Sequence, residues 1–447
     1  MNKRFILVLA LALTVGMTFS AYAEVQNVKV SGDIIASGVA RSHFNLANGP
    51  AGDKNHIKQD FFMSQVRLRI DADLTDNVAA TVRLINERVW NGQYDTASSG
   101  NSNIDLDLAY VTLKEFLYSP LTLTVGRQEI HLGNGLIIGN AKVGSSIVNI
   151  PTDLSERKAF DAIRATLNYD PLVVDVIYAK VKESNTDRNN DINLAGINAT
   201  YALNNKTDLS AYYFLKTDNN AGDSASRGKT DKVNTIGALV SSRPIENLNT
   251  SLEAAFQFGK NDGIGGNLDQ NEHKAFAVQA MADYTFAKVK MTPKIGASYT
   301  YLSGKKNLVG TSRNQGWDPM FNEQVLNNIA YAIFPMTDLS VLNLKASCKP
   351  VEDVTLMVNY GYYDIAKKAV GSRTITNSYY DSTSSYLSTI TLTGKRHMAD
   401  EIDVTALYDY TEDVQFGLTA GWLKTGSGLS LDRRLASQVI GSMKVSF

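Results

Sequence analysis

Apolar and polar residues alternate along most of the chain from Gln26 onward. Between Gln65 and Leu74, for example, Val66, Leu68 and Ile70 alternate with charged residues. Successive side chains of a β-strand point to opposite faces, so this pattern predicts strands with one apolar and one polar face. We count about eighteen such segments of roughly 10 to 15 residues, a length that lets a tilted strand cross a membrane.

Two kinds of connection join these segments in strict alternation. Short turns rich in Asn, Asp and Pro lie near 75–77, 119–120, 170–171, 204–206, 243–246, 287, 349–352 and 411–413. Long polar connections lie at roughly 45–60, 91–103, 131–158, 184–190, 218–230, 260–272, 304–335, 367–396 and 425–432. We therefore predict an all-β fold, a transmembrane antiparallel β-barrel of about 18 strands, with both termini and the short turns in the periplasm.

The two ends of the chain indicate the same location. Lys3 and Arg4 precede an apolar run, and Ala21-Tyr22-Ala23 forms a small-x-small cleavage site, which is typical of a secretory signal. We expect residues 1–23 to be a signal peptide and 24–447 to form the barrel in the bacterial outer membrane, in contact with its lipid. The last segment alternates toward a terminal aromatic, Phe447, as expected of the strand that closes a barrel.

Composition narrows the function further. The chain has 32 Gly, 21 Tyr and 16 Phe but only 1 Cys, which excludes an internal disulfide framework. It carries no motif for covalent haem and no metal-type His/Cys spacing, so we expect no cofactor and no metal site. The formal net charge of −1 gives no reason to expect a nucleic-acid partner.

The strand phase assigns charged residues to the barrel interior. If Val66, Leu68 and Ile70 face lipid, the residues between them must line a wet lumen, since Arg or Lys at the bilayer midplane costs about 2–4 kcal/mol. The interior set predicted in this way is Arg67, Arg69, Asp71, Asp73, Thr81, Arg83, Glu87, Asp105, Asp107, Arg164, Thr166 and Asn168. Two roles are open to it: contact with an anionic solute through guanidinium groups, or a network of ion pairs across the wall.

A barrel of this size leaves an aqueous passage, so transport follows from the geometry. We predict an outer-membrane channel for diffusion or export of small or polymeric hydrophilic solutes. The long connection at 131–158 is rich in glycine and partly apolar. It either folds inward as a constriction or remains an external loop.

Two motifs point to a known family. Gly126-Arg-Gln-Glu129 ends a predicted strand and precedes a Gly-rich turn, and Phe160-Asp-Ala-Ile-Arg164 opens a later strand. Over roughly residues 60–180 the chain resembles the alginate export porin family. The resemblance implies a charged lumen that conducts an anionic polysaccharide outward. Whether a periplasmic export partner delivers the solute is left open by the sequence. The resemblance adds Arg127, Glu129, Asp161 and Arg164 to the pore-lining candidates.

The phase of the strand conflicts with part of that assignment. Arg127 and Glu129 are in step with Leu123 and Val125, so they point inward only if the strand bulges or ends there. Asp161 is likewise out of step with Arg164. We further predict that Arg67, Arg69, Arg83, Arg127 and Arg164 set the field of the pore against Asp71, Asp105, Asp107 and Glu129.

The sequence is also compatible with functional classes other than a channel. None of the five histidines has a recognisable catalytic motif, and His131 beside Glu129 is the best candidate base, so we expect no catalytic residues and no enzyme. One alternative is a barrel sheath around multihaem cytochromes in an electron-transfer conduit. Another is a surface adhesin or receptor that binds ligand through long loops such as 376–390.

Overall fold

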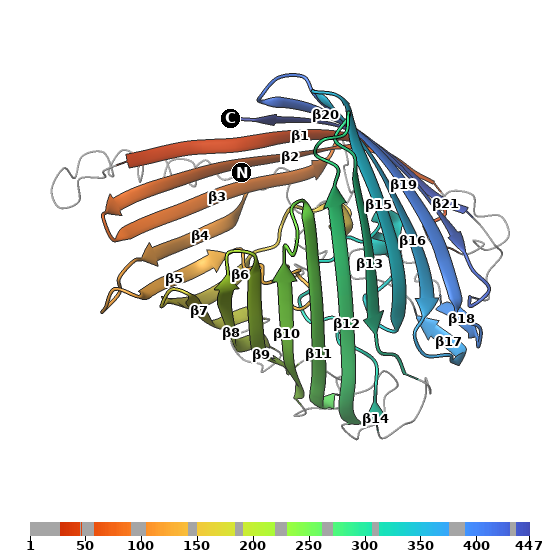
Figure 1. The fold of residues 1–447 in the computed structure, drawn as a ribbon, viewed down its shortest axis with the longest axis horizontal. Coiled ribbons are helices and arrows are strands. Elements are labelled where there is room, and N and C mark those ends of the chain that lie inside the picture. Colours follow the sequence, from red (N-terminus) through yellow and green to blue (C-terminus); the bar gives the residue numbers. More distant parts are fainter. Residues whose placement is uncertain are drawn as a thin grey trace, which may run out of the picture.

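The computed structural model describes residues 27–44, 46, 58–90, 104–141, 150–183, 191–219, 230–261, 271–305, 313–374, 389–429 and 435–447. The predicted signal peptide lies outside these residues. Within them, eighteen antiparallel strands form one closed wall (Figure 1). They are β1 (Asn27–Ser42), β2 (Lys58–Thr75), β3 (Val78–Val89), β4 (Asp105–Leu113), β5 (Leu121–Gln128), β6 (Phe160–Asn168), β7 (Leu172–Lys182), β8 (Ile192–Asn204), β9 (Thr207–Asp218), β10 (Asp231–Ser242), β11 (Leu248–Asn261), β12 (Asn271–Thr285), β13 (Lys294–Leu302), β15 (Leu339–Val351), β16 (Val354–Ile365), β19 (His397–Asp409), β20 (Val414–Thr425) and β21 (Leu435–Ser446).

The first and last strands close the barrel. β1 pairs with β21 in a register that runs from Asp33 opposite Ser446 to Ser42 opposite Ser437. At the end of this seam, Gly32 and Phe447 exchange two backbone hydrogen bonds of 2.8 and 3.0 Å. The predicted architecture, strand number and closing role of the C-terminal segment are confirmed.

Smaller elements lie in the long connections. β14 (Arg313–Asn314) adds a short parallel pairing to β12, and β17 (Val370–Thr374) and β18 (Thr389–Thr393) form a separate hairpin. The 3-10 helix η1 (Thr152–Leu154) and the helix α2 (Asn328–Ile333) belong to connections that enter the barrel. No helix among the described residues is long and apolar enough to cross a membrane.

Alternation of side chains gives the wall its two faces. On β2, Val66 and Ile70 are exposed on the outer surface, and the intervening Arg67 bonds to Asp33 of β1 and to Glu156 of an inner loop. On β3, Val82 is exposed outward and its neighbour Arg83 bonds inward to Asp107. An apolar outer face avoids the cost of placing charge in lipid, which is why the phase of each strand is fixed so strictly.

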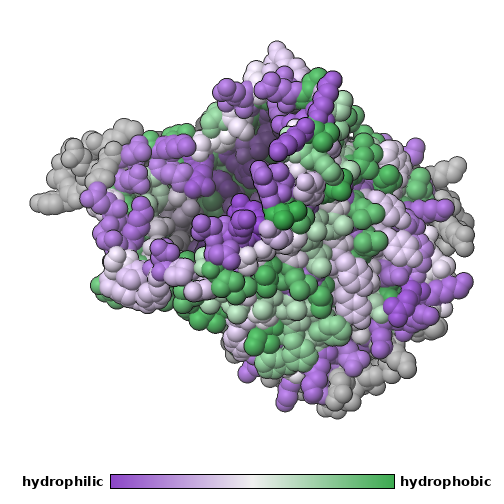
Figure 2. Space-filling view, viewed as in Figure 1, coloured by the Kyte–Doolittle hydropathy of each residue, from purple (hydrophilic) through white to green (hydrophobic). Residues whose placement is uncertain are grey.

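The apolar core lies inside the barrel, on one side of the lumen. Interior residues of the wall such as Phe160, Phe214 and Tyr363 belong to one buried apolar cluster with Ile138 and Phe321 from two inner segments. Figure 2 shows a hollow bordered by hydrophilic residues and, over the strands numbered from β8 to β12, a more apolar outer surface. The lumen is therefore filled unevenly, with apolar packing on one side and polar side chains around the remaining hollow.

Candidate substrate channel

Two long connections enter the lumen and meet there. The first infolded loop comprises residues 129–141 and 150–159, between β5 and β6, and the second comprises 315–338, between β14 and β15. Phe321 N donates to Ile137 O at 3.0 Å, Gly139 N donates to Phe321 O at 2.8 Å, and Glu323 N donates to Gly135 O at 2.8 Å. The inward-folding hypothesis for the connection at 131–158 is thereby confirmed for its described part.

Glycine makes this meeting of backbones possible. Gly135 has φ of +70°, a conformation that residues with a Cβ rarely adopt. A Cβ at Gly135 would lie 2.7 Å from Glu323 O, and one at Gly139 would lie 2.6 Å from the Glu323 side chain. The glycines noted in this connection therefore let one loop approach the other closely.

The helix α2 docks the second infolded loop onto the wall. Ile329 N and Ala330 N donate to the two carboxylate oxygens of Glu401 on β19 at 2.6 and 2.7 Å. Asp403, two residues further along β19, accepts from Asn327 Nδ2 at 2.9 Å and from Asn328 N at 3.2 Å. The two carboxylates thus satisfy backbone groups at the start of the helix that have no partner within it.

A charged contact ties the same loop to β9. Lys216 Nζ lies 2.9 Å from Asp318 Oδ2, and Met320 N donates to Asp318 Oδ1 at 2.7 Å. Burial acts to raise the pKa of the Asp318 carboxyl, but the attraction of Lys216 and these hydrogen bonds outweigh it and hold the pKa below its ordinary value. The carboxylate remains ionised at neutral pH and anchors the loop.

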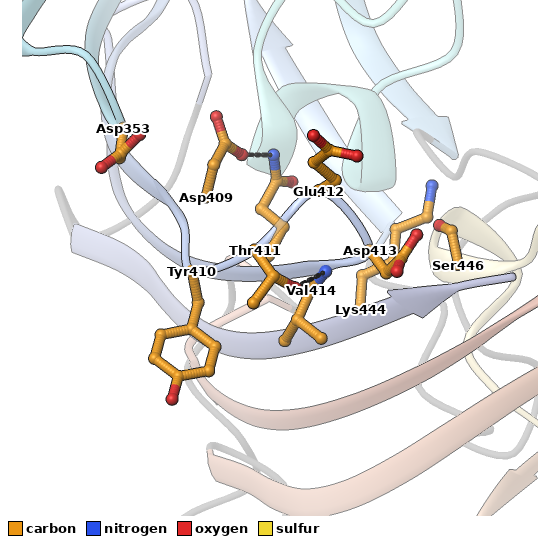
Figure 3. A pocket seen from close by; sticks show the side chains of 10 residues that line it. Asp353, Asp409, Tyr410, Thr411, Glu412, Asp413, Val414, Lys444 and Ser446 are labelled. Atoms are coloured by element: carbon orange, nitrogen blue, oxygen red, sulfur yellow. Dashed lines mark hydrogen bonds between the residues drawn. The ribbon is translucent and has the colours of Figure 1, made fainter.

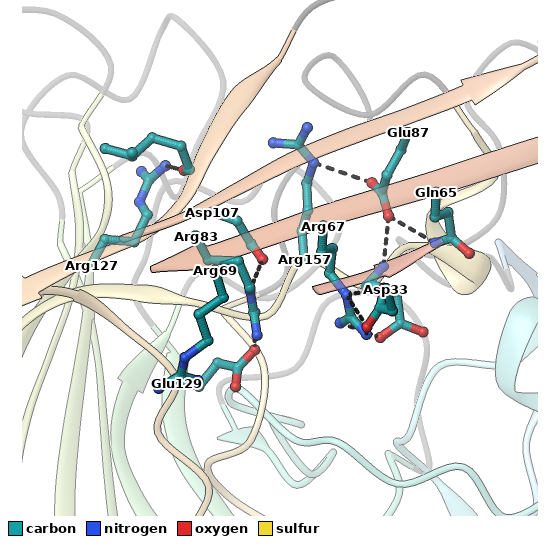
Figure 4. A network of polar contacts seen from close by, with 12 residues as sticks. Asp33, Gln65, Arg67, Arg69, Arg83, Glu87, Asp107, Arg127, Glu129 and Arg157 are labelled. Atoms are coloured by element: carbon teal, nitrogen blue, oxygen red, sulfur yellow. Dashed lines mark hydrogen bonds and ion pairs between the residues drawn. The ribbon is translucent and has the colours of Figure 1, made fainter. Parts of the chain in front are cut away.

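Polar and charged side chains fill the part of the lumen beside β1–β4. Arginines of β1–β3 and of the first infolded loop meet carboxylates from the same elements, from β4 and from just beyond β5 (Figure 4). We call this set the arginine–carboxylate network. Its members are Arg41, Arg67, Arg69, Arg83, Arg157, Asp33, Asp71, Glu87, Asp105, Asp107, Glu129, Asp153 and Glu156.

Arg67 and Arg83 occupy the centre of this network. Arg67 donates to Asp33 on the neighbouring strand at 2.6 Å and reaches Glu156 of the infolded loop at 3.0 Å. Arg83 bonds to Asp107 at 2.6 Å and also to Glu129. These arginines are therefore neutralised by carboxylates on both the wall and the loop.

Arg157 and Glu87 form a second buried pairing, after that of Arg41 with Asp153. Arg157 Nε lies 3.1 Å from Glu87 Oε2 and its Nη2 lies 2.7 Å from Asp105 Oδ2, and the Glu87 side chain is fully buried. Gln65, Ser155 and Glu156 also donate to Glu87, at 2.9, 2.9 and 2.8 Å. This carboxylate holds the infolded loop against the wall in the way that Glu401 holds α2.

Carboxylates outnumber arginines in the network, eight to five. The predicted ion-pair network is thus present, and its formal charge is negative. Several members remain partly exposed to the passage. The side chains of Glu129, Asp105 and Arg69 keep 44, 37 and 36% of their surface accessible.

The predicted interior residues fall largely on the interior. Arg69 bonds to Asp71 at 2.7 Å, and Thr81 donates to Asp71 at 2.7 Å. On β6, Arg164 bonds to Asp175 at 2.8 Å, so it lies inside but apart from the network. Each of these side chains lies on the face that the strand phase assigns to it.

Arg127 and Asp161 need a correction. They lie opposite each other in the β5–β6 register and bond at 2.6 Å. Arg127 is in step with Val125, which is 41% exposed on the outer surface, and Asp161 is in step with Ile163, which is 49% exposed there. The two residues therefore face away from the lumen, contrary to their assignment as pore-lining, because the β4–β5 and β5–β6 registers continue through them without a shift.

Glu129 faces inward for the reason that the phase argument allowed. β5 ends at Gln128, whose side-chain amide donates to Ala162 O at 3.1 Å, and the chain then leaves the sheet. Glu129 is thereby free to turn toward Arg83. The motif Gly126-Arg-Gln-Glu129 thus divides into an outward arginine, an inward glutamine and a carboxylate of the lumen.

Several interior residues were not predicted from the sequence. Arg157 and Asp153 lie in a connection without alternation, so phase gives no signal for them. Glu401 and Asp403 do alternate with Ile402 and Val404, which are exposed outward, and the same phase argument applied to β19 finds them. All of the residues predicted to line the pore lie between Arg67 and Asn168, in the N-terminal part of the chain.

His131 and His397 contact carboxylates in two different parts of the barrel. His131 Nδ1 lies 3.7 Å from Glu323, which also pairs with Lys158, so its partner lies in the other infolded loop. His397 Nε2 lies 2.8 Å from Asp400 at the outer end of β19. Within the described ranges no group of His, Cys, Asp or Glu is placed to hold a metal ion. The adhesin candidate segment 376–390 lies almost entirely outside the described residues.

The periplasmic edge carries a second group of acids. A hollow of about 570 Å³ beside the β19–β20 turn is bordered by Asp353, Asp409, Glu412 and Asp413, with Lys444 among them (Figure 3). Gln415 Nε2 donates to Asp409 at 2.7 Å. The rim of the barrel beside this turn is therefore acidic.

Several solved outer-membrane protein structures are similar to this barrel. OpdQ from Pseudomonas aeruginosa has a similar structure, with 13% sequence identity, a TM-score of 0.55, and coverage of 95% of this chain and 99% of that chain. A BenF-like porin from Pseudomonas fluorescens Pf-5 is 11% identical, with a TM-score of 0.56 and coverage of 95% and 100%. Pseudomonas aeruginosa OccK2 (OpdF), solved in complex with glucuronate, is 10% identical, with a TM-score of 0.54 and coverage of 95% and 100%. At these identities the likeness shows the fold.

The family follows from the sequence itself. No curated protein sequence matches the chain. The sequence model described as alginate export matches residues 32–437, nearly the whole chain. Together with the closed eighteen-strand barrel and its porin-like neighbours, this match places a channel-type protein in the bacterial outer membrane. The chain belongs to the alginate export family.

Proposed function

We propose that the protein is a diffusion channel for small hydrophilic solutes. The observation that carries this proposal is that both infolded loops are tied to each other and to the wall inside the barrel. Such a lumen is narrowed by its own chain, and the space left is bordered by charged side chains of the arginine–carboxylate network. A narrowed, polar passage suits solutes of the size of one or two sugar rings better than a polymer.

The charges of the network determine which ions pass most easily. Its excess of carboxylates favours small cations over small anions, and the pairing of most charges keeps that preference modest. The paired charges also suit solutes with hydroxyl groups, because exposed carboxylate groups accept hydrogen bonds from hydroxyl groups and exposed guanidinium groups donate to them.

Export of an anionic polysaccharide is the second candidate, and membership of the alginate export family favours it. In this role the infolded loops have to leave the lumen, and a polyanion has to pass a wall on which carboxylates outnumber arginines. The glucuronate bound to OccK2 is a property of that protein, but it makes single uronates a sensible first probe here. A conduit sheath is less well supported, since the chain's own loops occupy lumen space that an inserted cytochrome would need.

Planar-bilayer recording of the refolded protein tests the proposal. We expect stable single-channel current in salt, a reversal potential with a weak cation preference, and permeation of mono- and disaccharides in liposome swelling. Oligouronates of more than a few residues should not permeate. Permeation of long oligouronates at the rate of disaccharides would instead establish the polymer-export function, and the lack of any current would contradict both candidates.

A further inference from the structure

Two lysines stand side by side on the outer surface of the barrel, at the end that carries the long connections. Lys232 is the second residue of β10 and Lys260 is the last but one of β11, and the register places them directly opposite each other. Both are exposed and in step with outward residues, since Ile236 on β10 is 53% exposed and Phe256 on β11 is 44% exposed. The two ammonium groups therefore lie on the lipid-facing surface near the outer rim.

This lysine pair has no counter-charge in the part of the chain that the structure describes. Glu272, which lies opposite Lys260 on β12, pairs with Lys274 at 2.5 Å. Like charges directly opposite each other on a sheet repel. At the same end of the barrel, by contrast, Lys424 of β20 lies opposite the acidic Asp400 of β19. The pair on β10 and β11 thus presents positive charge that an external anion can neutralise.

An apolar groove lies on the same strands, closer to the middle of the membrane. Its volume is about 700 Å³, and Ile236, Phe256 and Phe276 border it on the outer surface. Figure 2 shows the apolar surface over these strands. The floor is a row of small residues, one on each of four neighbouring strands from β8 to β11: Ala199, Ala211, Ala238 and Ala254. We call this hollow the alanine groove.

The spacing between the lysine pair and the alanine groove matches one leaflet of a membrane. Lys232 and Ala238 are six residues apart on β10, which is about 20 Å along an extended strand. Strands of membrane barrels are tilted by about 35–45°, so the groove lies about 15 Å deeper than the lysines. Half of a typical hydrocarbon core is also about 15 Å thick. An acyl chain whose headgroup contacts the lysines therefore reaches the groove.

We propose that this surface binds a lipid of the outer leaflet that carries a phosphate monoester. The phosphate contacts Lys232 and Lys260, and one acyl chain lies in the alanine groove. A phosphate monoester carries a charge of about −1.5 to −2 at neutral pH, which matches two ammonium groups better than the single charge of a phosphodiester. Lipid binding here is separate from the proposed channel function, because the lysines and the groove lie on the outside of the wall.

Other occupants fit this surface less well. A second copy of the chain in a symmetric membrane dimer would present its own lysine pair at the same depth, so four ammonium groups would face one another. A soluble anion such as inorganic phosphate neutralises the lysines but leaves the groove unused. A neutral lipid fills the groove but leaves the lysines without a counter-charge. A lipid with a phosphate monoester satisfies both features.

The test is native mass spectrometry of the refolded protein in detergent micelles. Three probes are added separately: dioleoyl phosphatidic acid, dioleoyl phosphatidylglycerol and glycerol 3-phosphate. We expect one molecule of phosphatidic acid to bind several times more tightly than phosphatidylglycerol, which has the same acyl chains but a phosphodiester. Glycerol 3-phosphate should not bind in the same concentration range, because it has the phosphate but no acyl chain.

Variants then locate the lysine part of the site. The double variant Lys232→Gln and Lys260→Gln should weaken the binding of phosphatidic acid about thirtyfold, as expected for the loss of two lysines near an anionic headgroup. Lys424→Gln is the matched control, because Lys424 is also exposed on the outer surface near the rim but has Asp400 opposite it. Heat-modifiable migration verifies that each variant forms the barrel.

A second pair of variants locates the acyl chain. Ala238→Phe fills the alanine groove with an apolar ring that lipid tolerates, and it should weaken the binding of phosphatidic acid and phosphatidylglycerol alike. Val240→Phe is the control, because Val240 is 40% exposed on the same face of β10 but does not border the groove. Equal effects of the two substitutions would show that no acyl chain occupies the groove and would contradict the proposal.

Three further results would overturn the proposal. Equal binding of phosphatidic acid and phosphatidylglycerol would show that the surface does not select a phosphate monoester. Binding by the lysine double variant that is as tight as that by Lys424→Gln would remove the lysine pair from the site. A dimer that forms without lipid and dissociates in Ala238→Phe would assign the groove to a second copy of the chain instead.

Discussion

The two infolded loops fill the same lumen by different physical means. The second loop, residues 315–338, packs Phe321, Ile329 and Phe334 into an apolar core against the interior of the wall. The first loop, through residues 150–158, is held mainly by ion pairs to β1–β4. Apolar packing is non-directional and insensitive to salt, whereas ion pairs depend on geometry and on complete pairing. The passage lies beside the ion-paired part. We therefore expect the apolar packing of the second loop to hold both loops in place, and the charged residues around the first loop to determine ion selectivity.

The apolar side should show the largest effect of a single substitution. Phe321 is 4% exposed and stacks edge-to-face with Phe160 at a ring-centroid distance of 5.9 Å. Phe321→Ala should weaken loop docking by about 3–5 kcal/mol, because it opens a cavity where both loops meet. We expect higher and noisier single-channel conductance. Phe62→Ala, on the outer surface, is the control and should leave conductance unchanged; equal conductance in both variants would contradict the support role.

The charged side should respond nearly as strongly to the loss of Arg157. Arg157→Met leaves the buried Glu87 without its counter-charge, which costs about 3–5 kcal/mol and should release residues 150–158. The reversal potential should shift toward cations, and proteolysis within this loop should accelerate. Adding Glu87→Leu should restore much of the protease resistance, since the uncompensated charge is then gone.

Arg69→Gln is the matched control for that experiment. Arg69 and Asp71 are each about one-third exposed, so their pairing contributes at most about 1 kcal/mol. A loss of protease resistance as large as that of Arg157→Met would show that burial does not determine which ion pairs hold the loop.

Acidification should produce a smaller effect, and only at low pH. The pKa of Asp318 is held below its ordinary value, which is about 3.9 in the unfolded chain. Its pairing with Lys216 therefore contributes fully to loop stability above this unfolded pKa. The contribution is lost as the pH falls through the lower pKa of the folded protein. Conductance recorded from pH 8 to pH 3 should therefore show no loosening of this loop through Asp318 above about pH 4. If Asp318→Asn abolished an opening seen near pH 6, the carboxylate would titrate far above its expected range.

The smallest effect is expected at Arg127. Because this arginine faces away from the lumen and pairs with Asp161, Arg127→Gln should leave the reversal potential unchanged. Arg83→Gln, with an inward arginine between Asp107 and Glu129, should shift it toward cations. A shift with Arg127→Gln of the same size as with Arg83→Gln would return Arg127 to the pore.

Alternation along the strands was sufficient to predict the barrel, its strand number and the interior position of residues such as Arg67, Arg83 and Asp107. It works because lipid excludes charge from one face at every second residue. The family motif suggested that Arg127 and Asp161 line the pore. A similar residue pattern does not determine which face of the strand these side chains occupy. Arg157, α2 and the contact between the two loops could not be derived, because they depend on pairings between segments far apart in sequence that follow no period.

The seam between Gly32 and Phe447 has a consequence for how the molecule is made. The two residues that close the ring are separated by almost the entire described sequence, so this contact has the highest loop-closure cost in the fold. We therefore expect it to form last. Until then β1 and β21 are open edges, each with a row of unpaired backbone groups that can join a second chain. Newly made protein must therefore be kept from sideways association until both edges are complete, and truncation at either edge should yield aggregates instead of a smaller barrel.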